Sequence, residues 1–530
     1  MRTIIRGLLG LLAILVVLAI GLLLWVKGLA KDTGPEGRPT YGSYTWADTK
    51  PPRGGPTPRA DGYVMGSEGH DFILPPMPPV RSTDIHRADS VAANNAIRSC
   101  FWPGPKLRPG FYTTDPDDYG LENQLPDTGN TFSTAWFKIP EGAKIVMKGD
   151  FPAMRHWSYT TYSTNGVPRD VIDDVAIDPD AGSFNPFRPG VARDAKPRKY
   201  AVAIMNGDPP SPRPANTVYT RAPAMTDIGM HMRNYVPDRS VDWAGGVGVP
   251  QVELHLADGK VLTGQEACDA TAAPLREKQV PLPIPTKNWV ALTRLPWMPA
   301  DHTAAKNFEV ATMTRFFNRE HLLTQTFFPA IPSDGLAVEK GGFWSNFATR
   351  YGFTYLSQAN GSVYVVHGKM PTTPKNWDGT AKPLDQSADM RYWSICTGSA
   401  PPTGMTVDCV HDENMTGLLD PQGNFNVVVT RAPDRPANAT EKCGVVWMEY
   451  GNGDGIPGGS KDFGVVINRH THVNPKFEHS WFAVKKPNAE GEIMGDYLPK
   501  VLNLHDKARF EALGCPVDTT KLAAMAMQNK

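Results

Sequence analysis

A chain of 530 residues is long enough for two or three domains, each with its own hydrophobic core. Apolar residues make up 41% of it and charged residues 20%, which excludes a chain that is disordered throughout. The 54 basic and 54 acidic residues cancel, so the net charge indicates neither nucleic acid nor an anionic membrane surface as a partner.

The first elements along the chain are an apolar segment and a tether. Gly7–Val26 contains no charged residue, and Arg2 and Arg6 precede it. A helix of this length spans a bilayer and exceeds the apolar part of most signal peptides, although cleavage after it is an alternative. We therefore predict a signal anchor over residues 1–30 in the cytoplasmic membrane, with the bulk of the chain periplasmic or extracellular. Residues 31–109, rich in proline and glycine, are predicted to form a tether and lead-in.

The most informative pattern is an internal repeat. A strand-like stretch near residue 155 recurs near residue 391, with identical residues at one constant offset. The matching residues are Met154, Arg155, Trp157, Ser158 and Thr161 in the first stretch, and Met390, Arg391, Trp393, Ser394 and Thr397 in the second. Downstream, Arg-Pro-Ala-Asn occurs at 213–216 and 435–438, and Asp-x-Gly at 227–229 and 462–464. The sequence thus predicts two copies of one domain, at 110–260 and 325–500.

Each copy has short apolar runs rich in β-branched and aromatic residues. They are IVMKG, WSYTTYS, KYAVAIM and VELHL in the first copy, and VYVVHG, YWSICT, FNVVVT, GVVWMEY and FGVVIN in the second. The 50 prolines and 49 glycines favour turns between them. The predicted fold class is mainly β: two tandem, related β-sandwiches or jelly rolls with a few short helices, behind one N-terminal transmembrane helix.

Two further segments complete the predicted organisation. A proline-rich crossing at 261–324 joins the copies and contains a helix predicted from Ala304 to Thr324. The tail at 501–530 is predicted to be helical over Asp506–Leu513, because a glycine follows that stretch.

Three motifs resemble those of bacterial envelope proteins in families of unknown function, including the type with paired jelly rolls. They are MRYWSICT, DRPANA and DAGSFNPF. The resemblance covers most of the two copies and implies the paired β-sandwich fold. It carries no catalytic residue over to this chain.

The repeated Arg-x-Trp-Ser motif is a candidate binding site. Residues i and i+2 of a strand share a face, so Arg155 and Trp157 are expected to point the same way, as are Arg391 and Trp393. Such a pair could stack on a sugar ring and bind its carboxylate or hydroxyl groups. The structural alternative is a core tryptophan beside an internally paired arginine. Recurrence in both copies favours this alternative, because duplicated domains keep their packing residues.

An acidic loop is a candidate calcium site. It contributes Asp173, Asp174, Asp178 and Asp180, which precede a glycine. Carboxylates at this density supply the hard oxygen ligands that calcium prefers. The spacing is not that of an EF-hand, and aspartates also build turns, so a turn without a metal is the alternative.

Three histidines form a candidate transition-metal site. His470 and His472 lie in a strand-like run, which predicts both imidazoles on one face, and His479 follows closely. Such a set could bind zinc or copper, while exposed histidines without a metal are the alternative.

The cysteines are Cys100, Cys268, Cys396, Cys409, Cys443 and Cys515. None forms a CxxC pair, and an even number in an exported protein predicts up to three disulfides. A bond between Cys100 and Cys268 is the simplest first pairing, and Cys396 and Cys409 could join two neighbouring strands.

Linear motifs for nucleotide, haem or serine-hydrolase chemistry do not occur in the sequence. Our leading hypothesis is a non-catalytic, membrane-anchored protein that binds or scaffolds a glycan or other envelope polymer, with no cofactor except calcium at the acidic loop. The 13 tryptophans and 16 tyrosines fit that ligand class. The alternative is a polysaccharide lyase or hydrolase on the β-scaffold, for which His411, Asp412 and Glu413 are candidate acid–base residues.

Overall fold

The computed structural model describes most of the chain from residue 129 to residue 527, together with a few residues before it. The described ranges are 101–102, 105–106, 125, 127, 129–164, 166–238, 241, 244–273, 310–327, 331–377, 381–399, 406–450 and 463–527. Among these residues no helix is long and apolar enough to cross a membrane. The predicted anchor at 1–30 and most of the predicted tether lie outside the described ranges.

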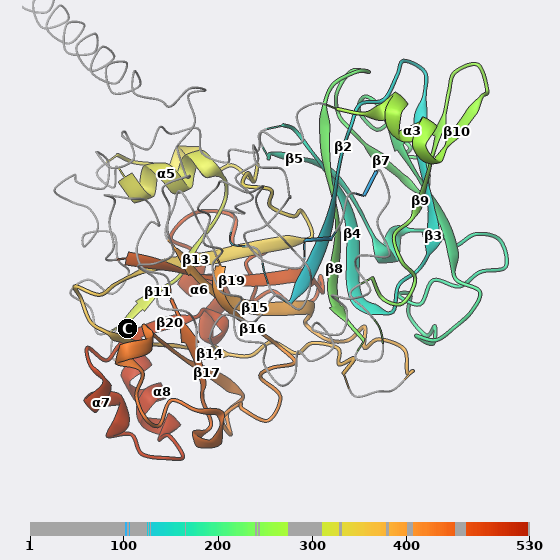
Figure 1. The fold of residues 1–530 in the computed structure, drawn as a ribbon. Coiled ribbons are helices and arrows are strands. Elements are labelled where there is room, and N and C mark those ends of the chain that lie inside the picture. Colours follow the sequence, from blue (N-terminus) through green and yellow to red (C-terminus); the bar gives the residue numbers. More distant parts are fainter. Residues whose placement is uncertain are drawn as a thin grey trace, which may run out of the picture.

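The described chain is mainly β, with four five-stranded sheets and a few short helices (Figure 1). Sheet A contains, in spatial order, β1 (Pro105–Lys106), β2 (Asn130–Phe137), β8 (Ile228–Pro237), β4 (Met154–Tyr162) and β5 (Pro168–Asp173). Sheet B contains β10 (Val261–Thr263), β9 (Gln251–His255), β3 (Lys144–Asp150), β6 (Lys199–Met205) and β7 (Thr217–Tyr219).

The other two sheets come from the C-terminal half. Sheet C contains β11 (Val310–Thr312), β20 (Lys500–Asn503), β14 (Val363–Lys369), β17 (Asn424–Thr430) and β18 (Val446–Glu449). Sheet D contains β12 (Thr314–Arg315), β13 (Thr349–Ser357), β19 (Phe463–Val473), β15 (Met390–Ser399) and β16 (Thr406–His411). The α-helices are α3 (Gly264–Thr271), α5 (Arg319–Phe327), α6 (Glu490–Met494), α7 (Lys507–Glu511) and α8 (Thr519–Met527).

The two halves have the same strand order over eight strands each. Sheets A and D share the order β2-β8-β4-β5 and β13-β19-β15-β16, and sheets B and C share β9-β3-β6-β7 and β20-β14-β17-β18. Each half also has one parallel pair at the corresponding place, β6 with β7 and β17 with β18. The runs predicted as strands all fall on strands, because alternating β-branched and aromatic residues suit a sheet with one face on a core.

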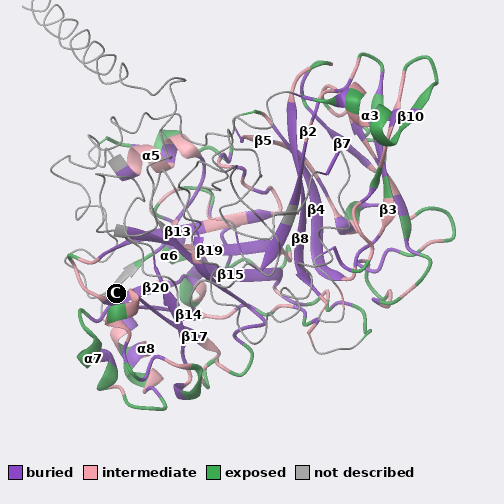
Figure 2. Cartoon of the chain, viewed as in Figure 1, coloured by how far each residue is buried: buried purple, intermediate pink, exposed green. Residues whose placement is uncertain are grey.

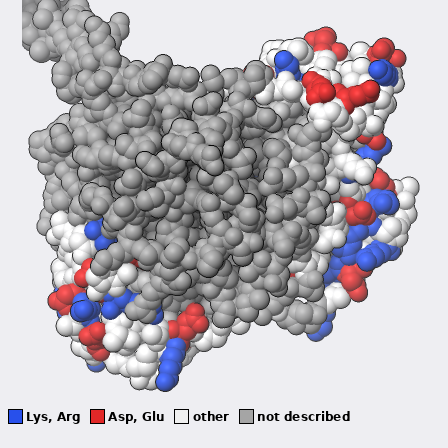
Figure 3. All heavy atoms as spheres, in the orientation of Figure 1, with Lys and Arg blue, Asp and Glu red and all other residues white. Residues whose placement is uncertain are grey.

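Each half is a sandwich with its own core, and the buried strands are purple in Figure 2. Side chains of sheets A and B form the first core, which includes Trp157 and Ile145. Side chains of sheets C and D form the second, which includes Trp393 and Val427. The other face of sheet C packs against α7 and α8, through residues such as Phe510. On the face shown in Figure 3, Lys and Arg are interspersed with Asp and Glu over the described surface.

The predicted helix from Ala304 to Thr324 is wrong over its described first part. Val310–Thr312 and Thr314–Arg315 are strands that pair with β20 and β13, and the helix begins only at Arg319. Edge pairing with two existing strands overrides local propensity here. The second sandwich therefore extends beyond the predicted 325–500 at both ends. The predicted tail helix is confirmed as α7, whose N-cap Asp506 accepts a hydrogen bond from the backbone N–H of Arg509.

Candidate functional site

The outer faces of sheets A and D meet in a buried polar interface between the two sandwiches. The strands of the two sheets run across one another there (Figure 1). Every residue of β4 and β8 is buried, although only one face of each can contact the core of its own sandwich. The other face carries polar residues, among them Arg155, His156 and Thr160, that the second sandwich covers.

Arg155 is the centre of this interface. Its guanidinium forms ion pairs with Asp412 and Glu413 of the second sandwich and donates to Asn376 Oδ1 at 2.9 and 3.2 Å. Burial lowers the pKa of Arg155, but the two carboxylates outweigh this effect and raise the pKa above its ordinary value. Burial likewise acts to raise the pKa of Asp412, and Arg155 reverses this, so that the pKa is lowered.

Arg391 makes the reciprocal contact from the second sandwich to the first. Its Nη1 lies 3.7 Å from Asp174 Oδ1, and its guanidinium donates to the carbonyls of Arg155 and Phe187 at 3.1 Å. Asp174 also accepts from His156 Nδ1 at 2.7 Å. Burial would raise the pKa of Asp174, but His156 and Arg391 lower it to about 2. A buried arginine from each sandwich thus contacts an aspartate of the other.

The reciprocity extends along the interface. Asp174 and Asp412 each accept from a backbone N–H of the repeated motif, that of Trp157 at 2.9 Å and that of Trp393 at 3.4 Å. The guanidinium of Arg233 donates to the carbonyl of Trp344, and that of Arg469 donates to the carbonyl of Leu125. Contacts that run both ways in this manner are the pattern of a self-complementary, two-fold interface.

The expectation that the arginine and tryptophan of each motif share a face is wrong. Met154 and Trp157 both lie in the first core, whereas Arg155 points into the interface. Residues on one face of a regular strand are two or four positions apart, so the three-residue spacing of Met154 and Trp157 shows that the alternation of faces is interrupted between them. On the neighbouring strand Val236 lies between the partners of Met154 and His156 and has a φ of 46°. This left-handed residue interrupts the pairing. Trp157 is 1% exposed.

The same interruption occurs in the second sandwich. Met390 and Trp393 lie in the core, Arg391 lies in the interface, and His472 on the neighbouring strand has a φ of 50°. Trp393 is also 1% exposed, and its ring packs on Phe425 with centroids 4.8 Å apart. These positions match the structural interpretation of the motif, in which the tryptophans are core residues.

The predicted metal ligands lie in separate surroundings. Asp173 is 3.4 Å from His472, Asp174 bonds to His156, Asp178 pairs with Arg188 at 2.6 Å, and Asp180 is exposed. In the described part of the chain, the only group of three ligand side chains close enough for one metal ion is Asp127 with Cys396 and Cys409. The two sulfur atoms of that group are bonded to each other.

The prediction that His470 and His472 share a face is wrong. His470 packs against Trp481, a residue of the second core, with ring centroids 5.9 Å apart. His472 instead contacts His156 of the first sandwich at 5.3 Å between centroids, because its left-handed backbone breaks the alternation. His479 bonds to the carbonyl of Ile493 at 2.9 Å.

The candidate acid–base residues are components of the interface. His411, Asp412 and Glu413 are 3%, 1% and 7% exposed. Both carboxylates are engaged by Arg155, and Glu413 Oε1 also accepts from the backbone N–H of Asn376 at 3.0 Å. Packing between the two sandwiches is therefore enough to explain why Asp412 and Glu413 are buried.

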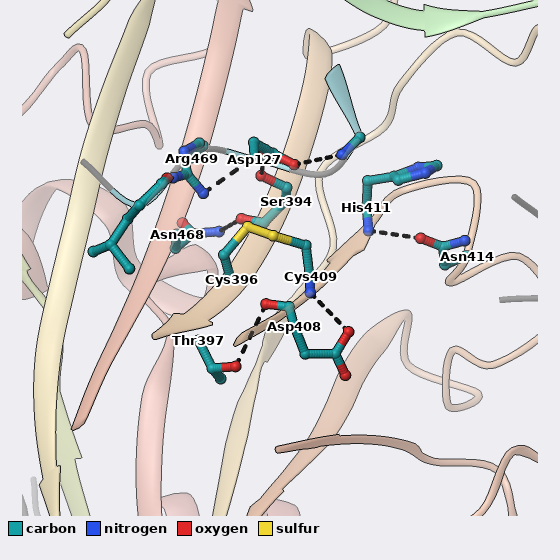
Figure 4. The surroundings of a disulfide bond; sticks show 12 residues. Asp127, Ser394, Cys396, Thr397, Asp408, Cys409, His411, Asn414, Asn468 and Arg469 are labelled. Carbon is teal, nitrogen blue, oxygen red and sulfur yellow. Dashed lines mark hydrogen bonds and ion pairs between the residues drawn. A yellow bond between two sulfur atoms is a disulfide. The ribbon is translucent and has the colours of Figure 1, made fainter. Parts of the chain in front are cut away.

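Two disulfides are described in full. Cys396 and Cys409 are direct cross-strand partners on β15 and β16, as predicted, with Cα atoms 4.1 Å apart (Figure 4). Asp127 lies beside this bond and accepts from the backbone N–H of Gly129 at 2.8 Å. The second bond joins Cys443 and Cys515. Cys268 is also disulfide-bonded, and its predicted partner Cys100 lies outside the described residues.

A pocket of about 1020 Å³ opens at the end of the first sandwich. It is bordered by the end of β3, the loop 193–198 before β6 and the loop after β8, and two residues of the second sandwich complete it. Its charged lining residues are Arg193, Lys196, Arg198, Asp150, Asp194 and Asp238. This volume is at the upper end of the range for small-molecule sites.

The pocket is connected to the interface through Asn376. This side chain accepts from Arg155 and donates to Asp238 Oδ1 at 2.8 Å and to the carbonyl of Val236 at 2.7 Å. Asp238 in turn forms an ion pair with Arg193. Our sequence interpretation missed the pocket. The signal that could have indicated it is the dense alternation of charges in RDAKPRK, at 193–199, directly before a predicted strand.

No protein-family model and no curated protein matches the chain. Among the solved structures that match the chain are two with low sequence identity and low TM-scores. One is an uncharacterised protein from Burkholderia cenocepacia, with 12% identity, a TM-score of 0.38, and coverage of 80% of this chain and 88% of that one. The other is the VPA0106 protein from Vibrio parahaemolyticus, with 10% identity, a TM-score of 0.33, and coverage of 78% and 93%.

Proposed function

We propose that the protein binds a glycan or other polar polymer of the cell envelope, and that the ligand enters the pocket at the end of the first sandwich. The observation that carries this proposal is the pocket itself, with its volume of about 1020 Å³ and its six charged lining residues. Hydroxyl-rich ligands are bound by arrays of charged donors and acceptors such as these.

Rigid walls support this role. Arg193 is tied to Asp238, and its backbone N–H donates to the carbonyl of Ala381 at 3.0 Å. At another lining residue, Gly245, an added Cβ would lie 2.5 Å from a side-chain carbon of Pro152, so the chain approaches itself closely there. A preformed pocket loses little conformational entropy when a ligand binds.

A blocking variant tests the proposal on the full chain. Ala381 lines the pocket and is exposed, so Ala381→Trp should fill the entrance and abolish binding to an array of envelope oligosaccharides. Ala512→Trp, an exposed position beside α7, is the matched control and should bind as the parent does. Equal binding by both variants would contradict the proposed location.

A lyase or hydrolase is the second candidate function. The specific observation that favours it is the presence of Asp150 and Asp194 in the same pocket as Lys196, because carboxylates and lysine can act as acids or bases. Incubation of any bound polymer with the protein, followed by analysis of its chain length, separates the two functions. Shortening of the polymer would identify an enzyme.

We also propose that the protein is anchored in the cytoplasmic membrane with its bulk outside the cytoplasm, and that its two sandwiches arose by tandem duplication. The disulfides are compatible with an oxidising compartment. The shared strand order and the reciprocal contacts of Arg155 and Arg391 support the duplication. These contacts would descend from a dimer of one ancestral sandwich.

A further inference from the structure

Arg198 is a buried cation in the wall of the pocket. It directly precedes β6 and is 7% exposed. Its guanidinium donates to the carbonyls of Ala195, Phe151 and Arg193, at 3.1, 3.3 and 2.7 Å. A guanidinium has five N–H groups, so two remain that no described residue accepts. The three carbonyls hold the group in place beside the pocket.

The charge of Arg198 has no direct counterion among the described residues. The ion pairs within 4.0 Å include Arg193 with Asp238 and Lys199 with Asp150, the latter at 3.8 Å, but none with Arg198. Burial lowers the pKa of Arg198, while the more distant carboxylates of Asp150 and Asp194 act in the opposite direction. Burying a cation without a partner is unfavourable, and an anionic ligand would remove that cost.

A second cation lies on the same wall. Lys196 lines the pocket, is exposed, and forms no ion pair with any residue that the structure describes. Because Asp238 is paired with Arg193 and Asp150 faces Lys199, the charges left for a ligand are those of Arg198 and Lys196 against that of Asp194. The local balance therefore favours an anionic group.

We propose that Arg198 and Lys196 form a subsite for an anionic oxygen group, a carboxylate or a phosphate, on a hydroxylated ligand. This inference rests on the proposed function and deepens it, since it names the ligand class. A planar guanidinium with two remaining N–H groups can bind two oxygen atoms of such a group, and the flexible lysine adds a point charge. The ligands that fit are acidic polysaccharides with uronic acid units and polyol-phosphate polymers.

The test measures binding of three oligomers to the full chain by calorimetry. The probes are an oligogalacturonate, an oligomer of glycerol phosphate, and a neutral oligosaccharide of matched length. At least one anionic probe should bind about tenfold or more tightly than the neutral one, because a hydrogen bond to a charged group contributes that factor. The preferred anionic probe identifies which of the two chemistries is the natural one.

Single substitutions test whether the anionic probe binds at Arg198 and Lys196. Lys196→Gln, at an exposed position, should weaken binding of the anionic probe several-fold and by a larger factor than binding of the neutral probe, because glutamine keeps a hydrogen-bond donor but not the charge. Arg198→Lys should weaken it further, and its melting curve shows whether the fold is intact. Lys144→Gln, an exposed lysine in β3, is the matched control and should bind as the parent does.

Two results overturn the inference. If the neutral probe binds as tightly as the anionic ones and Ala381→Trp abolishes it, the pocket binds a polymer but this subsite does not select an anion. If Lys196→Gln and Arg198→Lys bind the anionic probe as the parent does, the anion lies elsewhere. Absence of binding by all three probes would contradict the proposed function as well.

Discussion

Arg155 of the first sandwich and Asp412 of the second form an ion pair in which both side chains are fully buried. Glu413 and Asn376 complete the surroundings of the guanidinium. Removal of one partner from a buried ion pair is strongly destabilising. This pair joins two sandwiches that each have a separate core.

Arg155→Met should therefore destabilise the protein by about 3–5 kcal/mol, because Glu413 would stay buried without this ion pair and Asp412 would keep the more distant cation of Lys375, at 3.8 Å. Denaturant unfolding measures the change. The control is Asp178→Asn, which removes the ion pair between Arg188 and Asp178, whose side chains are 37% and 55% exposed. Its effect should be below about 1 kcal/mol. Similar losses in both variants would show that the interface charge has no special role.

Trp393→Ala should lower the free energy of unfolding by about 3–5 kcal/mol and reduce the yield of exported protein, since Trp393 is a core side chain. Phe184→Ala is the matched control, because that ring is 48% exposed. A stable, well-exported Trp393→Ala variant that has lost ligand binding would instead support the stacking interpretation of the motif.

The interface should respond to pH through His472. Burial acts to lower the pKa of His472, but Asp173 and Asp174 reverse this and raise the pKa above 6.5. A raised pKa in the folded state contributes stability that is fully present below pH 6.5 and is lost as the pH rises through the folded pKa. The melting temperature should therefore fall as the pH rises above 6.5 and His472 loses its proton. His472→Asn keeps a residue that tolerates the left-handed backbone and should remove this part of the pH dependence.

The two described disulfides should differ in their effect on stability. Cys443 and Cys515 are 72 residues apart, and Cys396 and Cys409 are 13 apart. Removal of the longer link should cost about 4 kcal/mol and of the shorter about 3 kcal/mol, because a larger loop gains more entropy in the unfolded chain. Denaturant unfolding of Cys515→Ser and Cys409→Ser measures the two losses of stability.

Thiol counting on the parent protein should find at most one free thiol per chain. Four or more free thiols would contradict the predicted pairing of the cysteines.

The predicted topology places residues from Lys31 onward outside the cytoplasm, because the basic N-terminal end is held inside. An alkaline phosphatase fusion at Gly34 should be active. An inactive fusion there, together with an active cytoplasmic reporter at the same position, would refute the orientation.

Much of the fold could be predicted because strands depend on local pattern. The runs around Trp157 and Trp393 are rich in aromatic and β-branched residues, which favour strands, and both lie on strands that pack on a core. The link between Cys396 and Cys409 was also predictable, because a short separation across a turn favours adjacent strands. The residue types alone thus determined the class of the fold and one of its cross-links.

Only the tertiary structure decided which way the functional candidates point. His472 faces the first sandwich and His470 faces the second core because one left-handed residue reverses the alternation that a regular strand would have. The partners of Arg155 and the pocket at Arg198 depend on loops and strands far apart in the sequence. The sequence by itself determined the strands, since side-chain alternation is local. The interface and the pocket depend on how the two sandwiches pack together. That packing cannot be predicted from local sequence patterns, because it brings together residues that are far apart in the sequence.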